Sequence, residues 1–131
     1  MSEAALFLVS IGPGFTEHVT PMAAQALKES DAVVGYSLYF DWIKPLLNSQ
    51  EIHSLPLTQE RERARKALEL ARKGKRVSLV SSGDVGVYAM ASLVFEELEE
   101  MDAIAVCVVP GITAANACAS LSMSRFIGSR S

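Results

Sequence analysis

The sequence predicts an α/β protein with a doubly wound parallel sheet of five strands. Short apolar runs alternate about five times with segments of helical periodicity, a pattern typical of a parallel sheet covered on both faces. Three glycine motifs each follow an apolar run, at 12–14, 83–86 and 111. The chain has 131 residues, half of them hydrophobic, which is the size and composition of one folded domain.

The first half of the chain contains three predicted strands and two predicted helices. Leu6–Ile11 is a continuous apolar run, as expected for a strand buried on both faces. Thr20 and Pro21 provide an N-cap and a first-turn proline for a helix. The other expected elements are a short strand at 32–34, a short helix with an irregular end at 37–47 and a weak strand at 51–55.

The second half begins with a long amphipathic helix from Thr58 to Lys73, and Gly74 is a natural stop signal. We then expect a strand at 77–80, a helix from about 88 to 101, a strand at 103–109 and a last helix from 113 to about 121. The residues predicted to be buried are Ala64, Ala67, Leu68 and Ala71 in the first of these helices, and Tyr88, Ala91, Val94, Phe95, Leu98 and Met101 in the second.

Composition and charge narrow the classes of function. Twelve basic and fifteen acidic residues give a net charge of −3, so nothing in the charge points to nucleic acid or an anionic membrane as a partner. No apolar run approaches the roughly 20 residues of a membrane span, and the first residues lack the basic segment of a signal peptide. Cys107 and Cys118 form no CxxC pair, so we expect buried, reduced thiols in a cytoplasmic protein.

The glycine motifs do not match the common nucleotide sites. After Gly12-Pro13-Gly14, the third glycine of a dinucleotide fingerprint is replaced by Glu17, and Pro13 removes a backbone donor. The second strand ends in Val34-Gly35-Tyr36, without the carboxylate that would hold a ribose. No GKS or GKT follows a glycine loop, which excludes a P-loop.

Each motif also has an interpretation without a ligand. The first fits a tight turn, Asp84 fits the N-cap of the helix expected near Tyr88, and Thr113 fits the N-cap of the last helix. In an open parallel sheet, however, loops at the carboxyl ends of strands line the ligand crevice. Three such loops of small residues therefore favour a backbone-lined pocket for a small ligand.

Taken together, these segments resemble the tetrapyrrole methylase family over about residues 6–121. The resemblance is carried by GPG after the first strand, VVGYSLY at the second, SSGDVGVYAMA after the fourth and VPGITAANA after the fifth. The segments are most similar to the branch that methylates carbon 17 of precorrin-3B or its cobalt form. Uroporphyrinogen methylases share the GPG loop but carry an aspartate where Ser37 stands here. The GLG-type first loop of diphthine synthases and the TPIGN-type loop of ribosomal RNA methylases do not match.

The resemblance implies a fold, a methyl donor and a substrate. Family members have an amino-terminal domain with a five-stranded parallel sheet of order 3-2-4-1-5, and they bind S-adenosyl-L-methionine between two domains. The substrate is a polycarboxylate tetrapyrrole, and methylation of its carbon 17 is joined to ring contraction. The donor-binding residues implied are Gly12, Pro13, Gly14, Gly83, Asp84, Val87, Tyr88, Thr113 and Ala114.

Candidates for contact with the substrate are Tyr36, Tyr39 and Ser82, with His18 a weaker one. The alternatives are packing of the tyrosines with an exposed hydroxyl and an exposed loop position for His18. No acid or base for ring contraction is identified, and no metal ligands are expected. The basic stretch 61–76, with its interspersed glutamates, is interpreted as a solvated helix face, with docking of substrate carboxylates as the alternative.

The resemblance also carries an expectation about domains and assembly. Residues 1–121 correspond to the family's amino-terminal domain, 122–131 are expected to be a frayed tail, and the second domain of the family is absent from these 131 residues. We therefore expect a chain that folds but turns over little substrate alone, and a homodimer as in the family. Another branch of the family, or a non-catalytic binding or assembly module, is the alternative.

Overall fold

The computed structural model describes residues 4–12 and 16–111, apart from the side chain of Asp84. Its five strands form one all-parallel sheet in the order β3-β2-β4-β1-β5, which confirms the predicted order. The strands are β1 Ala5–Ser10, β2 Ala32–Gly35, β3 Glu51–Ser54, β4 Arg76–Ser81 and β5 Ala105–Val109. The helices are α1 Pro21–Glu29, α2 Ser37–Ile43, α3 Glu60–Arg72 and α4 Gly83–Glu97, with short 3-10 helices η1 Thr16–His18 and η2 Lys44–Leu46.

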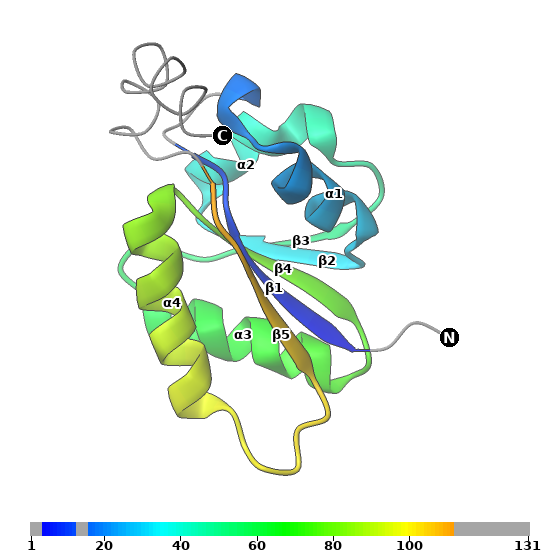
Figure 1. Cartoon of the computed structure of the whole chain (residues 1–131), viewed down its shortest axis with the longest axis vertical. Helices are drawn as coiled ribbons and strands as arrows, with labels where there is room; N and C mark the ends of the chain where they lie inside the picture. The colour runs from blue at the N-terminus through cyan, green and yellow to red at the C-terminus, as the bar shows by residue number, and fades with distance from the viewer. Residues whose placement is uncertain (1–3, 13–15, 112–131) are drawn as a thin grey trace, which may run out of the picture.

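The helices form two layers around the sheet. In Figure 1, α1 and α2 lie on one face, and α3 and α4 lie on the other. Alternate residues of β1 enter the two cores: Leu6 and Leu8 pack under α3 and α4, whereas Val9 packs with α1. Because both faces of β1 are covered, the strand is apolar at nearly every position.

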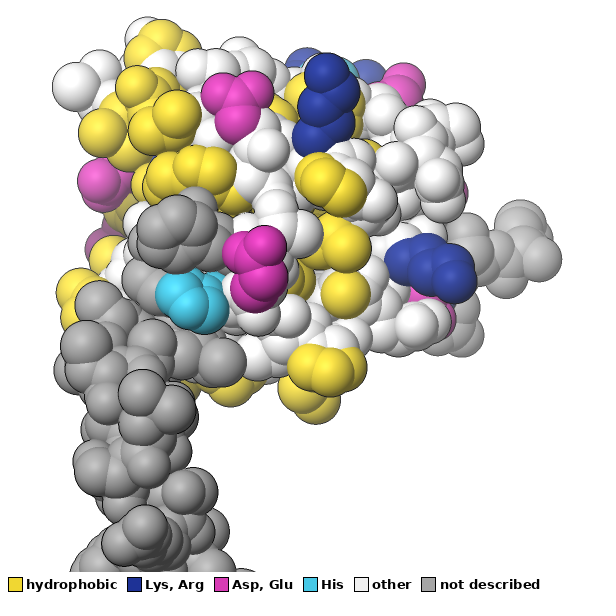
Figure 2. Space-filling view, turned by 90° about the horizontal axis from the view of Figure 1, so that it is seen from above, with side chains coloured by type: hydrophobic (Ala, Val, Ile, Leu, Met, Phe, Trp, Pro, Cys, Tyr) yellow, Lys and Arg dark blue, Asp and Glu magenta, His cyan; other side chains and the backbone are white. Residues whose placement is uncertain are grey.

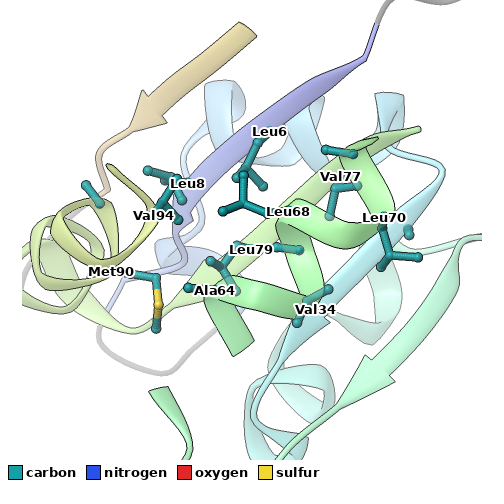
Figure 3. Packing of buried hydrophobic residues seen from close by; sticks show 14 of the residues in the cluster. Leu6, Leu8, Val34, Ala64, Leu68, Leu70, Val77, Leu79, Met90 and Val94 are labelled. Atoms are coloured by element: carbon teal, nitrogen blue, oxygen red, sulfur yellow. The ribbon is translucent and has the colours of Figure 1, made fainter. Parts of the chain in front are cut away.

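The larger core lies between the sheet and helices α3 and α4 (Figure 3). The predicted stripe of α3, made of Ala64, Ala67, Leu68 and Ala71, is fully buried there. Burying one side chain the size of Leu68 contributes about 1.5–3 kcal/mol. The small alanines bring α3 close to β2 and β4, so this helix is held firmly against the centre of the sheet.

Two predicted helix signals are confirmed by local geometry. The Thr20 hydroxyl oxygen accepts a hydrogen bond from the backbone N–H of Ala23 at 3.1 Å, so Thr20 caps α1. Just after the carboxyl end of α3, Gly74 has a φ of +91°, which an L side chain rarely adopts. The α3 helix is thereby closed at the position where the sequence predicts its end.

The predicted limits of the fourth helix were wrong, and its predicted buried face is confirmed only at Ala91 and Val94, with Leu98 partly buried. Helix α4 begins at Gly83 and ends at Glu97, rather than running from about 88 to 101. Its buried side chains are Val87, Met90, Ala91 and Val94, while Tyr88, Phe95 and Met101 are more than half exposed. Glycines in the first turn disguise the helix start because glycine has poor helix propensity, but packing against the sheet outweighs that preference.

The predicted burial of Cys107 was also wrong. Cys107 is exposed because β5 is an edge strand, and α1 does not extend over all of its outer face. Beside this strand lies a shallow apolar hollow lined in part by Phe7, Met22 and Cys107. Cys118 and the helix expected from 113 to 121 lie outside the described residues.

An ion pair closes the edge of the sheet where the strands begin. The Arg72 guanidinium donates to both carboxylate oxygens of Asp102, at 2.9 and 2.8 Å. The same carboxylate accepts from the backbone N–H of Glu99 at 2.8 Å. The Arg72 guanidinium, followed by the Glu99 N–H, lowers the pKa of Asp102 from 3.8 to about 2. The pair therefore holds the loop between α4 and β5 against the end of α3.

Replacing Asp102 with Asn is expected to lower the melting temperature at neutral pH. Because the folded-state pKa of Asp102 lies below its unfolded value, its contribution is complete above about pH 4 and is lost as the pH falls through about 2. Thermal melts of the original chain and Asp102→Asn should therefore converge between pH 4 and 2. Glu100→Gln, on the same loop, is the control, and a melting difference that persists unchanged at pH 2 would contradict the assignment.

Candidate functional site

The carboxyl ends of three strands lie level with one another. The parallel register pairs Ser10 of β1 with Ser81 of β4, and Val9 of β1 with Val109 of β5. Just beyond the strands, the Ile11 N–H donates to the Ser81 carbonyl oxygen at 2.9 Å. The loops that follow β1, β4 and β5 therefore leave the sheet at the same edge, which is the upper edge in Figure 1.

Each of these loops contains a glycine whose conformation or packing excludes a larger residue. Gly12 and Gly83 have φ values of +81° and +78°. At Gly111, an added Cβ would lie 2.7 Å from the Ser10 carbonyl oxygen and 2.9 Å from its hydroxyl oxygen. The loop after β5 thus packs directly on the end of β1. The predicted convergence of the three loops is confirmed for these three glycines.

The space in front of Gly83 is open. An added Cβ there would meet no heavy atom of the described residues within 4 Å. The residue before it, Ser82, is the N-cap of α4 but makes no side-chain capping bond. The first N–H groups of a helix have no partner within the helix, and they carry the positive end of its dipole. This corner of the edge is therefore suited to a negatively charged group.

An aromatic cluster stands next to this corner, at the end of β2. The rings of Tyr36 and Tyr39 meet edge to face with centroids 5.5 Å apart, and the Trp42 ring is also 5.5 Å from that of Tyr39. The Thr16 hydroxyl donates to the Trp42 carbonyl oxygen at 2.6 Å and so connects η1 to α2. The two predicted tyrosines are thus held together, half-buried, beside the glycine loops.

A cavity of about 80 Å³ lies between α2, α3 and the beginning of α4. Its lining includes the predicted residues Tyr39 and Ser82 together with Arg63, which the prediction did not single out. Arg63 is only 3 % exposed, so the interpretation of the basic stretch as a solvated face was wrong for this residue. The available signal is its spacing, since Arg63 lies in phase with Ala64 and Ala67 on the buried stripe.

The other predicted site residues are distributed as follows. Val87 is completely buried in the core under the sheet, so its side chain holds α4 in place, while Tyr88 is 55 % exposed. Asp84 lies in the first turn of α4, not at an N-cap. His18, in η1, is half-buried, not fully exposed. Pro13, Gly14, Thr113 and Ala114 lie outside the described residues.

Figure 2 looks down on this edge, where hydrophobic side chains are interspersed with a few charged ones. A larger hollow of about 520 Å³ lies at the opposite edge, around Arg72 and Asp102, away from the glycine loops. Its walls include the ion pair described above, the buried Ala71 at the end of α3 and exposed loop residues such as Met101. Size alone therefore does not locate the candidate site. In the described part of the chain, no helix combines the length and apolar character needed to cross a membrane, and no cluster of potential metal ligands is present.

A parallel sheet of this order, with glycine loops converging at its carboxyl edge, defines an α/β protein with a candidate small-ligand site at the strand ends. The chain belongs to the Tetrapyrrole (Corrin/Porphyrin) Methylases, whose family profile matches residues 5–124.

Two curated relatives show the extent of the similarity. The chain is 45 % identical over 121 residues to the cobalt-factor III methyltransferase of Priestia megaterium, covering 88 % of this chain and 22 % of the relative. It is 39 % identical over 118 residues to the probable cobalt-factor III C(17)-methyltransferase of Salmonella typhimurium, covering 88 % of this chain and 48 % of the relative. The chain thus spans half or less of the length of these relatives.

Solved structures agree with this placement. The methyltransferase CobJ superimposes with a TM-score of 0.78 at 39 % identity, over 91 % of this chain and 51 % of that one. The uroporphyrin-III C-methyltransferase of Thermus thermophilus, solved in complex with S-adenosylhomocysteine, superimposes with a TM-score of 0.64 at 25 % identity. This match covers 84 % of the present chain and 46 % of the Thermus chain.

The packing of the β5 loop on β1 is tested by Gly111→Ala. The new methyl group would overlap the Ser10 carbonyl, so we expect the free energy of unfolding to fall by about 1–3 kcal/mol. The matched control is Gly86→Ala, where the added Cβ would lie 3.4 Å from the Ser81 Cβ and removal of a helical glycine should stabilise by up to about 1 kcal/mol. Urea denaturation measures both variants, and equal stability of Gly111→Ala and the original chain would contradict the close packing.

Proposed function

We propose that this chain forms the donor-binding half of an S-adenosylmethionine-dependent methylase of cobalamin biosynthesis. The reaction is methylation of carbon 17 of precorrin-3B or cobalt-precorrin-3B, with ring contraction to the corresponding precorrin-4. The observation that carries the proposal is the convergence of Gly12, Gly83 and Gly111 at one edge of the sheet. Family membership and the names of the relatives support the choice of substrate.

The described residues fit the methyl donor. The open space at Gly83 allows a ligand to approach the backbone, and the N-terminus of α4, where Ser82 makes no capping bond, offers N–H groups to the carboxylate of the methionine portion. The donor, when bound, supplies an electrophilic methyl group. The chain's own contribution is positioning, which lowers a barrier by about 7–11 kcal/mol at best. Few titratable side chains are therefore needed at this edge for methyl transfer itself.

The relatives carry names for both forms of the substrate. Three proteins named as cobalt-factor III methyltransferases match at 45, 41 and 39 % identity, and the precorrin-3B C(17)-methyltransferase from Sinorhizobium matches at 34 %. The proposal therefore includes the macrocycle with and without cobalt. The metal ion belongs to the substrate, and no residue of the chain is assigned to it.

Because these 131 residues span about half the length of the Salmonella relative or less, we assign them half of the site. In the relatives, residues outside the matched part are proposed to complete it. A polypeptide of this sequence is therefore expected to bind the donor with little turnover of its own.

Two further parts of the proposal, a homodimer and a cytoplasmic location, rest on the family. Exposed Val85 and Tyr88 at the upper edge are consistent with a surface that a further domain or subunit covers.

The donor site is tested by Gly83→Ala with Gly74→Ala as its matched control. Both glycines have positive φ, and in both places an added Cβ meets nothing within 4 Å, so each substitution should cost a similar 1–2 kcal/mol, roughly, of folding stability. Only Gly83 lies at the proposed site. Calorimetric titration with S-adenosylmethionine should show micromolar binding to the original chain and to Gly74→Ala. Affinity for Gly83→Ala should fall by about tenfold or more, equivalent to about 1.4 kcal/mol.

Two results would count against the proposal. Absence of binding to the folded original chain at millimolar donor would favour a non-catalytic module. Equal affinities of Gly83→Ala and Gly74→Ala would place the donor elsewhere.

A further inference from the structure

The guanidinium of Arg63 is a buried cation without a counter-charge among the described side chains. Arg63 is 3 % exposed, and it takes part in none of the ion pairs of the described residues. Its hydrogen bonds both leave from Nη1, to the carbonyl oxygens of Pro56 at 2.7 Å and Leu57 at 2.9 Å. Arginine remains protonated in proteins, and a buried charge without a partner is costly. An anion that reaches Arg63 would remove that cost.

The free part of the guanidinium is the part that suits a carboxylate. Among the described residues, the buried Nε has no acceptor and Nη2 donates to no group. Together, Nε–H and Nη2–H form one of the two-pronged edges with which arginine binds both oxygens of a carboxylate. The two carbonyl bonds from Nη1 fix the plane of the guanidinium. Arg63 is thus held in place by the β3–α3 loop with this edge unused.

The cavity beside Arg63 has the size of one small anionic group. Its volume of about 80 Å³ holds a few water-sized groups and is far too small for a macrocycle. Tyr39 and Ser82, two residues with hydroxyl groups, are part of its lining, and Gly86 lines it from the first turns of α4. Because the positive end of the α4 dipole is close by, the helix adds to the attraction of Arg63 for an anion.

One carboxylate already borders the cavity. Glu60 lines it from the beginning of α3, but its side chain is exposed and forms no ion pair with Arg63. Solvent screening makes such an exposed carboxylate a weak competitor for the buried guanidinium. Removing the Glu60 charge should therefore strengthen the binding of an anion here or leave it unchanged.

We propose that Arg63 binds one peripheral carboxylate of the macrocyclic substrate and so positions the ring beside the methyl-donor site. The inference rests on the proposed function, which supplies a substrate with carboxylate side chains. Arg63 is a positioning and specificity residue, because the carboxylate it binds is remote from the carbon that is methylated. The cavity takes the carboxylate, and the ring itself lies outside it, along the open edge.

The first test measures binding of uroporphyrin III, a stable macrocycle with carboxylate side chains, by fluorescence titration of the complete 131-residue chain. Arg63→Gln should weaken binding by about tenfold or more, since hydrogen bonds to charged groups are the stronger ones. Arg63→Lys keeps the charge but loses the two-pronged edge of the guanidinium, so its affinity for uroporphyrin III should lie between those of the original chain and Arg63→Gln. The matched control is Arg65→Gln, two residues along α3, where the side chain is 57 % exposed and pairs with Glu97.

A second measurement separates binding from a purely structural role of Arg63. In the unsubstituted chain with labelled arginine, the Arg63 Nε–H resonance should shift on addition of uroporphyrin III, while that of Arg65 should not. This readout needs no variant, so it remains decisive if Arg63→Gln fails to fold. An unmoved Arg63 resonance at saturating uroporphyrin III would overturn the proposal.

The same variants are titrated with S-adenosylmethionine, because its own carboxylate is the other group that could bind to Arg63. The proposal predicts unchanged donor affinity for Arg63→Gln. Loss of donor affinity with unchanged uroporphyrin affinity would reassign the cavity to the donor and overturn the inference. If the chain binds the donor but not uroporphyrin III, the inference fails while the methyl-donor assignment stands. If it binds neither, both fail.

Discussion

The parallel register between β1 and its two neighbours determines which loops meet at the carboxyl edge of the sheet. Ser10 lies opposite Ser81, and Val9 lies opposite Val109, so three separate glycine loops are delivered to one level. A slip by one residue would exchange the two faces of β1, placing Leu6 and Leu8 in the wrong core. The two cores therefore fix the register, and the register fixes the site. Packing far from the edge thus determines which loops meet there.

Features set by neighbouring residues in the sequence could be predicted, whereas features set by contacts between distant residues could not. Alternating apolar and helical segments predict the sheet, and glycines after strands predict its functional edge, because both are local signals. The start of α4 was missed because glycines at 83 and 86 mask it until the helix packs on the sheet. Burial of Arg63 and exposure of Cys107 depend on neighbours distant in sequence. Only the phase of Arg63 with the alanines of α3 offered a hint.

The carboxyl edge combines two kinds of recognition. Backbone groups at the glycine loops suit a compact ligand that must approach closely, and they leave little for side chains to do. The buried guanidinium beside Tyr39 and Ser82 suits a charged group on a larger ligand. The methyl donor is the compact ligand, and the polycarboxylate macrocycle is the larger one that carries charged groups. On the proposed function, this arrangement would let one edge of one sheet serve both partners of a transfer reaction.

We propose that the three strand-end loops surround the methyl donor. The most direct test is an amide-resolved NMR titration of the chain with S-adenosylhomocysteine, the demethylated product. If the loops surround the donor, the largest shifts should occur at the amides of Gly12, Gly83 and Gly111, while that of Gly74 at the opposite end stays unchanged. Shifts gathered around Arg72 and Asp102, at the larger hollow of the opposite edge, would contradict the proposal.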